Sequence, residues 1–151
     1  MTMKTLFDAA SLQELIGRID SLTPASQARW GKMNAEQMVA HLLEAMKLAT
    51  GEVTAKQRKM IFRYPPFRQF LVYLMPFPKG APTLPELRRR DTDAGTLEQN
   101  RAELTRVLRD IGSRSAQKQW PEHPAFGNLS RRAWGVLGYR HADHHLRQFG
   151  V

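Results

Sequence analysis

Apolar residues recur along this chain at spacings of three and four positions, the repeat of an α-helix that buries one face. The first such stripe spans residues 11–22 and ends before Pro24. The second spans residues 35–50 and ends at Gly51, a residue type that favours helix termination. The two predicted faces consist of Leu12, Leu15, Ile16, Ile19 and Leu22, and of Met38, His41, Leu42, Ala45 and Leu48.

Three further segments show the helical repeat. Residues 54–77 are predicted to be helical but interrupted at Pro65 and Pro66, while residues 96–112 and 131–147 are continuous. No run alternates as a strand does, and no internal repeat is visible. The sequence therefore predicts one all-α domain over residues 1–151, most simply a four-helix bundle with irregular loop insertions. The last helix carries one inward stripe, formed by Trp134, Leu137, Gly138, His141 and His145.

Helix starts are marked by a small polar residue followed three positions later by Glu or Gln, the pattern of a capping box. Such a pair precedes four of the predicted helices, and Ser130 is the expected N-cap of the last. We expect a helix to begin at each pair. The pairs are Ser11 with Glu14, Asn34 with Gln37, Thr54 with Gln57, and Thr96 with Gln99.

Two loops rich in Pro or Gly separate the later helices. Residues 76–95 contain four prolines and two glycines without periodicity, and residues 120–129 read WPEHPAFGNL. Long loops inside a compact domain are often functional. The first loop therefore either forms a lid or wall of a pocket or serves only to connect two helices.

The chain has no cysteine among its 151 residues, so disulfides and thiolate metal sites are excluded. A bound metal would need His, Asp, Glu or water as ligands. The N-terminus lacks the apolar stretch of a signal peptide, and the apolar run at residues 70–77 is too short to span a bilayer. We expect a cytoplasmic protein without a membrane partner.

The chain has 23 lysine and arginine residues and 14 acidic residues, which gives a formal net charge of +9. Nucleic acid, anionic lipid and anionic small molecules are therefore candidate partners. The charge is scattered, with clusters only at residues 87–90 and at Arg131 and Arg132. No nucleic-acid-binding motif accompanies them. A solvated surface is the favoured interpretation, and nucleic acid is not the expected partner.

Three of the five histidines fall within the last eleven residues, and His141 and His145 lie one helical turn apart on the inward stripe. His41 lies on the inward face of another predicted helix. Three imidazoles around one point suit a divalent ion such as zinc, nickel or iron and leave positions open for water or substrate. The alternative is that His41 is a hydrogen-bonded core residue and that the last histidines form a solvated helix end.

Five further residues are candidates for the rim of such a site. His144 lies about 60 to 100° around the helix from the pair and is less suited to be a ligand. Asp143 is either exposed or orients a ligand, and Gln148 and Glu44 follow His145 and His41 by three positions. His123, in HPAFG, either lines a pocket or belongs to a loop in which Phe126 plugs the end of the bundle.

Three segments carry a family resemblance: WGKMNAEQMVAHL, MPFPKGAPTLPE and HPAFGNLSRRAWGVLGYRHADHHLRQFGV. From about residue 27 onward the chain resembles the DinB-like (DinB/YfiT-type) superfamily of metalloenzymes, in an uncharacterised branch. The resemblance implies a four-helix bundle with a divalent metal on His41, His141 and His145. Many members continue from the last histidine with Arg-Gly-Gln, whereas this chain has Leu146, Arg147 and Gln148, so only the Gln keeps its position.

Characterised members of the superfamily include transferases and isomerases that use low-molecular-weight thiols such as bacillithiol or mycothiol, and homodimers occur among them. The resemblance thus implies a metal-dependent transferase or hydrolase that activates a thiol or water and acts on a small molecule. Two alternatives remain open at this point. In the first, the chain is a non-catalytic basic module that binds nucleic acid or another anionic ligand, and its histidines are structural. In the second, it is a member of the superfamily that retains only the fold.

Overall fold

Four long helices dominate the structure, a computed structural model that describes residues 2–81, 83, 85–87 and 95–151. They are α1 (Ala9–Asp20), α2 (Ala35–Thr50), α4 (Leu97–Ser113) and α5 (Arg131–Gln148). The shorter ones are η1 (Ile61–Arg63), α3 (Phe67–Gln69), η2 (Phe70–Leu74) and η3 (Pro85–Leu87). The described part of the chain contains no strand, and the predicted all-α class is confirmed.

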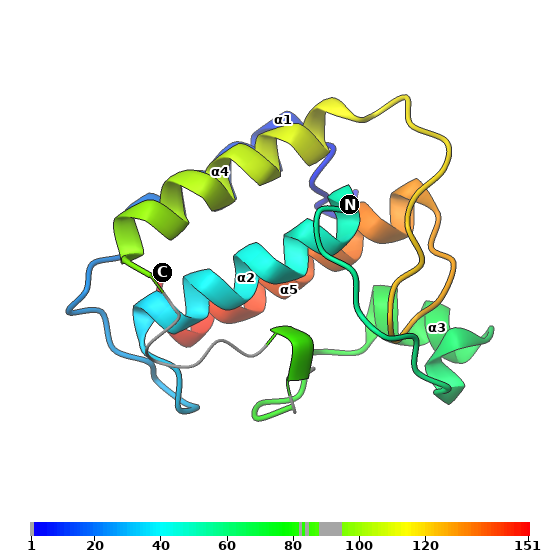
Figure 1. Cartoon of the computed structure of the whole chain (residues 1–151), viewed down its shortest axis with the longest axis horizontal. Coiled ribbons are helices and arrows are strands. Elements are labelled where there is room, and N and C mark those ends of the chain that lie inside the picture. The colour runs from blue at the N-terminus through cyan, green and yellow to red at the C-terminus, as the bar shows by residue number, and fades with distance from the viewer. Residues whose placement is uncertain (1, 82, 84, 88–94) are drawn as a thin grey trace.

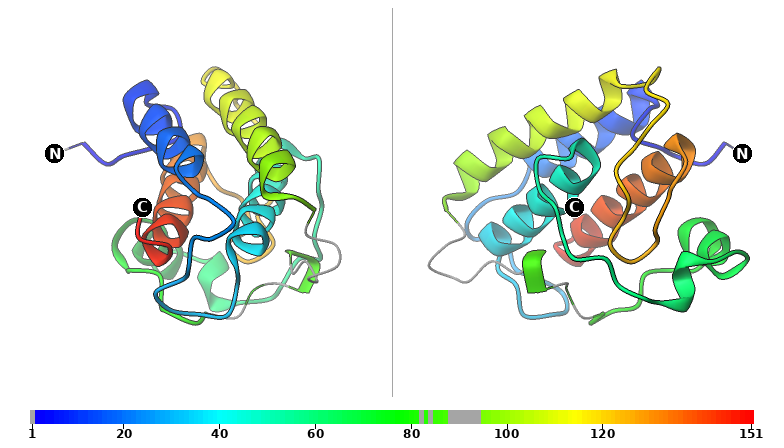
Figure 2. Two further views of the ribbon diagram at one scale, coloured as in Figure 1. Left: turned by 90° about the vertical axis from the view of Figure 1, so that its left-hand side faces the viewer. Right: turned by 45° about the vertical axis from the view of Figure 1, so that its right-hand side comes forward.

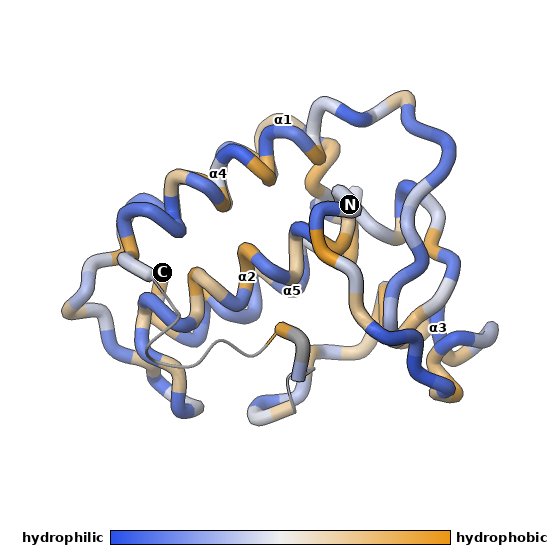
Figure 3. The backbone as a smooth tube through the Cα atoms, in the orientation of Figure 1, coloured by the Kyte–Doolittle hydropathy of each residue, from blue (hydrophilic) through white to orange (hydrophobic). Residues whose placement is uncertain are grey.

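The long helices form two layers around one core (Figures 1 and 2). α1 and α4 lie side by side in one layer, and α2 and α5 in the other. Across the layers, α1 packs against α5 and α4 packs against α2, while α1 contacts α4 and α2 contacts α5 within their own layers. Figure 3 shows that apolar positions on the helices alternate with polar ones. The apolar stripes meet inside, where the largest fully buried side chains include Leu15, Ile19, Met38, Leu42, Leu104, Leu108, Ile111 and Leu146.

Three of the predicted caps are confirmed. Asn34 and Gln37 form a reciprocal capping box at the start of α2, which ends at Gly51 in the left-handed conformation (φ 81°). Thr96 caps α4 by accepting from the backbone N–H of Gln99, and Ser130 caps α5.

The capping box predicted at Ser11 is wrong. α1 begins two residues earlier, because the Asp8 carboxylate accepts from both the backbone N–H and the hydroxyl of Ser11, at 2.8 and 2.6 Å. A charged acceptor next to the helix N-terminus is a stronger cap than a hydroxyl one turn later.

The helix start predicted at Thr54 is also wrong, because residues 54–60 are not helical. Their polar groups bond to the second loop instead: the Arg58 backbone N–H donates to the Pro124 carbonyl at 2.9 Å, and the Gln57 side chain donates to the Glu122 carbonyl at 3.3 Å. Helical structure appears only as the short η1, α3 and η2, on either side of the two prolines.

No helix among the described residues is long and apolar enough to cross a membrane. The basic cluster noted at residues 87–90 lies outside the described residues except for Leu87, which is buried.

The buried apolar residues of α4 should account for most of what this helix contributes to the free energy of unfolding. Leu104 is fully buried, so Leu104→Ala should lower the free energy of unfolding by about 2 to 5 kcal/mol through lost burial and the cavity left behind. Urea denaturation measures this directly. The exposed Arg109→Ala on the same helix is the control, with an expected change within about 0.5 kcal/mol. Equal effects of the two variants would contradict the assigned core.

Candidate metal centre

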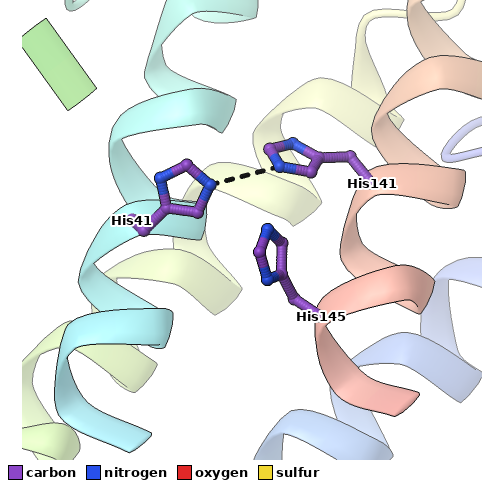
Figure 4. A group of neighbouring side chains, drawn as sticks. All are labelled: His41, His141 and His145. Atoms are coloured by element: carbon purple, nitrogen blue, oxygen red, sulfur yellow. Dashed lines mark hydrogen bonds between the residues drawn. The ribbon is translucent and has the colours of Figure 1, made fainter. Parts of the chain in front are cut away.

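Three histidines from two neighbouring helices converge in the structure (Figure 4). His41 lies near the middle of α2, and His141 and His145 face it from successive turns of α5. The Nε2 atoms of His41 and His141 are 3.2 Å apart. One nitrogen of each ring can be chosen so that all three lie within 4.8 Å of one another. The structure thus brings together the three histidines that the sequence singles out.

The spacing of these nitrogens matches a metal site. Two nitrogens bound to one tetrahedral zinc at about 2.0 to 2.1 Å lie about 3.3 Å apart. The His41–His141 pair already has this spacing, and the ligand atoms of all three rings lie within 4.8 Å of one another. Without a metal, the same short distance requires one Nε2–H to donate to the other nitrogen.

The environment favours the neutral form of each ring. His41 and His145 are only 6% and 8% exposed, and His141 is partly buried. Burial lowers the pKa of all three, and the neighbouring imidazoles add to this at His141 and His145, so that the pKa of His145 is about 4 and that of His141 lies well below its ordinary value. At neutral pH the rings therefore carry the lone pairs that a metal ion requires.

Gln148 fixes the tautomer of His145. The Gln148 side chain lies between the carbonyl oxygen of Trp30, 2.7 Å from its Nε2, and His145 Nδ1, 2.9 Å from its Oε1. A carbonyl oxygen only accepts, so the amide nitrogen must face Trp30 and the amide oxygen must face the ring. His145 Nδ1 therefore carries the hydrogen and donates it to Gln148, which leaves the Nε2 lone pair free.

The loop before α2 holds Gln148 in place. The Arg29 backbone N–H donates to the Gln148 carbonyl at 2.7 Å. Gly31 has a positive φ of 83°, and a Cβ there would overlap Gln148 Nε2. The sequence did not single out Trp30 or Gly31 for the site, because the contact joins residues more than a hundred positions apart.

An aromatic wall covers one side of the cluster. Phe77 stacks on His141 with ring centroids 5.7 Å apart and also contacts His144. The Arg140 guanidinium lies over Phe77 and donates to the carbonyls of Leu71, Val72 and Met75. Arg140 thereby ties the end of η2 to α5. The start of the first Pro- and Gly-rich loop is thus a wall of the histidine cluster.

The remaining rim candidates divide into near and distant groups. His144 lies beside the cluster, in contact with His145, Phe77 and Trp30, while Lys79 lies over the Trp30 ring at 4.5 Å. Glu44 is buried one turn after His41. Asp143 faces away from the cluster: its carboxylate pairs with Arg18 at 2.8 Å and Arg147 at 2.9 Å and orients none of the three histidines.

His123 belongs to a separate turn. Its Nδ1 accepts from the backbone N–H groups of Ala125 and Phe126, at 3.1 and 3.2 Å. Its ring lies against those of Phe126 and Trp134, and burial, followed by the charge of Arg63, lowers its pKa to about 4. This histidine acts as a neutral acceptor that closes the HPAFG turn.

Two hollows, of 190 and 200 Å³, lie elsewhere on the described surface. The first is beside Arg68 and Ser130, and the second beside Leu48 and Pro121. Neither is lined by a histidine of the cluster.

Comparison with known proteins shows one family. Residues 1–150 match the family described as "Protein of unknown function (DUF1569)", so the chain belongs to it. No curated protein and no solved structure matches the chain.

The turn around His123 should make stability depend on pH. The unfolded ring has the ordinary pKa of 6.5 and the folded ring about 4, so below pH 6.5 protons bind the unfolded chain preferentially. The His123 contribution should fall by about 1 to 3 kcal/mol from pH 6.5 to about 4. His123→Asn keeps an acceptor near the Nδ1 position but does not titrate.

Urea denaturation of both proteins at pH 7 and pH 4.5 isolates this contribution from those of the other histidines. The variant should lose less stability than the parent between the two pH values. Parallel losses would show that His123 is already charged in the folded protein.

Proposed function

We propose that this member of the DUF1569 family is a metalloprotein of DinB-like fold in which His41, His141 and His145 bind one divalent cation. The observation that carries the proposal is the convergence of three imidazoles from α2 and α5, two of them buried and one partly buried, with one nitrogen of each ring within 4.8 Å of the others. The two-layer packing of four long helices supports the DinB-like assignment, since sites in helical bundles form between inward faces of neighbouring helices.

The donor set fits zinc, nickel or iron(II), because all three ions accept imidazole nitrogen. A bound ion with only three protein ligands keeps a position for water or substrate, and it would lower the pKa of a water or thiol held there. The protein's own groups have distinct roles around it. Gln148 holds His145 in the binding tautomer, and Phe77 shields one face of His141 from water.

The function supported best is a transferase or hydrolase that acts on a small molecule in the cytoplasm. Since the chain has no cysteine, the nucleophile would be either a low-molecular-weight thiol or water. Lys79, over the Trp30 ring beside His144, places a positive charge near the cluster. That charge favours a substrate or thiol that carries a carboxylate or another anionic group.

Metal binding tests the proposal. Protein purified without a histidine tag should contain, or take up, one ion per chain by elemental analysis and calorimetric titration with zinc or nickel. His41→Ala, His141→Ala and His145→Ala should each abolish tight binding, because each removes one of three ligands. His144→Ala is the matched control and should retain the ion. A parent protein that binds no ion would assign the three histidines a structural role.

Gln148 should raise metal affinity through His145. Gln148→Leu keeps the volume but removes the acceptor for His145 Nδ1, so the affinity for zinc should fall about 10- to 100-fold. Gln119→Leu, at an exposed position, is the control. Unchanged affinity in Gln148→Leu would show that the ring orientation does not depend on this hydrogen bond.

Gly31 and Gly80 provide a second, matched pair. Both have a positive φ, 83° and 79°, but a Cβ meets Gln148 only at Gly31 and meets nothing within 4 Å at Gly80. Gly31→Ala should therefore weaken zinc binding as Gln148→Leu does, while Gly80→Ala should carry only the backbone strain. Calorimetric titration distinguishes them, and equal affinities would contradict the role of the loop.

A further inference from the structure

The segment from η1 to η2 exposes an apolar surface that the metal site does not explain. Six large apolar side chains there are 41 to 70% exposed, and they are Ile61, Tyr64, Phe67, Phe70, Leu74 and Met75. The same segment protrudes from the two layers of long helices (Figures 1 and 2). A concentration of exposed aromatic and aliphatic groups on a protruding element is typical of a docking surface. We call these six residues the apolar face.

Helical spacing gathers part of the apolar face on one side. Phe67 and Phe70 are three residues apart in α3 and its C-cap, and Phe70 and Leu74 are the two ends of η2, a π-helix in which four residues nearly complete one turn. Val72, between them, is fully buried and anchors the opposite side in the core. Arg140 fixes the end of η2 through its hydrogen bonds to backbone carbonyls. The apolar face is therefore presented by a firmly attached segment.

The charge of this stretch of sequence has a single sign, with Glu122 of the second loop pairing with its Arg63 at 3.8 Å. Between Glu52 and Glu86 the sequence contains no acidic residue but six basic ones, so this stretch accounts for six units of the formal net charge of +9. Lys56 and Lys59 are exposed on the extended segment that leads into η1. The basic residues are Lys56, Arg58, Lys59, Arg63, Arg68 and Lys79.

We propose that the apolar face docks on a bilayer surface that contains anionic phospholipid. Aromatic and aliphatic side chains would enter the interface between headgroups and acyl chains, while the exposed Lys56 and Lys59 would face the lipid phosphates. A second copy fits less well, because a two-fold contact through this face would bring the same basic residues against their own copies. Such docking requires no helix that spans the membrane, and it revises the expectation that the protein has no membrane partner.

Vesicle co-sedimentation tests the proposal with the full chain. The protein should bind vesicles of phosphatidylcholine mixed equally with phosphatidylglycerol much more strongly than vesicles of phosphatidylcholine alone, and salt should weaken the binding. Combined Phe67→Ser, Phe70→Ser and Leu74→Ser should reduce the partition coefficient about tenfold or more. Combined Lys56→Glu and Lys59→Glu should have an effect of at least about the same size.

Matched controls separate docking from general effects. Met3→Ser changes an exposed apolar residue outside the segment, and combined Arg109→Glu and Lys118→Glu reverses two exposed positive charges elsewhere. Both controls should bind vesicles like the parent. Circular dichroism and thermal unfolding verify that every variant folds.

Three results would overturn the proposal. The first is absence of binding to the mixed vesicles. The second is vesicle binding that the Lys56→Glu and Lys59→Glu variant loses but the triple serine variant keeps, which would show that charge attraction alone causes the binding. The third is a concentration-dependent dimer in light scattering that only the serine variant abolishes, without vesicle binding, which would assign the face to a second copy. Vesicle binding does not depend on the proposed metal, so failure here leaves the metal-binding tests unaffected.

Discussion

The packing of α2 against α5 is the contact on which the rest of the structure depends. It sets His41 opposite His141 and His145, two residues that only a helix aligns on successive turns. Gly138, one turn before His141, helps the surrounding chain to close on α5, because a Cβ there would overlap Leu6 and touch Met46. A change of register between the two helices would separate the imidazoles.

This contact also concentrates polar groups where burial is costly. Leaving a buried polar group without a partner costs about 1 to 3 kcal/mol, and three imidazoles in one place repeat that cost. The protein offsets part of it with the His145–Gln148 hydrogen bond and the His41–His141 contact. A shared metal ion would satisfy the facing nitrogens together, which is the physical reason to interpret the cluster as a binding site.

Much of the fold could be predicted from local sequence. The stripe of α4, the capping box at Asn34 and the cap at Ser130 are local signals, and the structure has helices where they place them. The failures at Ser11 and Thr54 have a common physical origin. A competing partner, the Asp8 carboxylate in one case and the backbone of residues 122–124 in the other, uses the groups that the pattern assigned to a helix start.

The candidate site, too, could be predicted only in part from local sequence. Histidine spacing within one helix is visible in the sequence, and the structure adds what helix packing and loops contribute. The Trp30 carbonyl, Gly31 and Phe77 reach the cluster from segments with no local histidine signal, so only the tertiary structure connects them to it. Arg140 further links the wall of the cluster to the apolar face through η2.

The most direct test of the metal centre is X-ray absorption spectroscopy of the zinc-loaded protein, which reports the atoms around the ion. We expect three imidazole nitrogens at about 2.0 to 2.1 Å with one oxygen ligand from water, and one fewer imidazole in His145→Ala. A shell made of oxygen ligands alone would contradict this prediction. A spectrum that does not change in His145→Ala would contradict it as well.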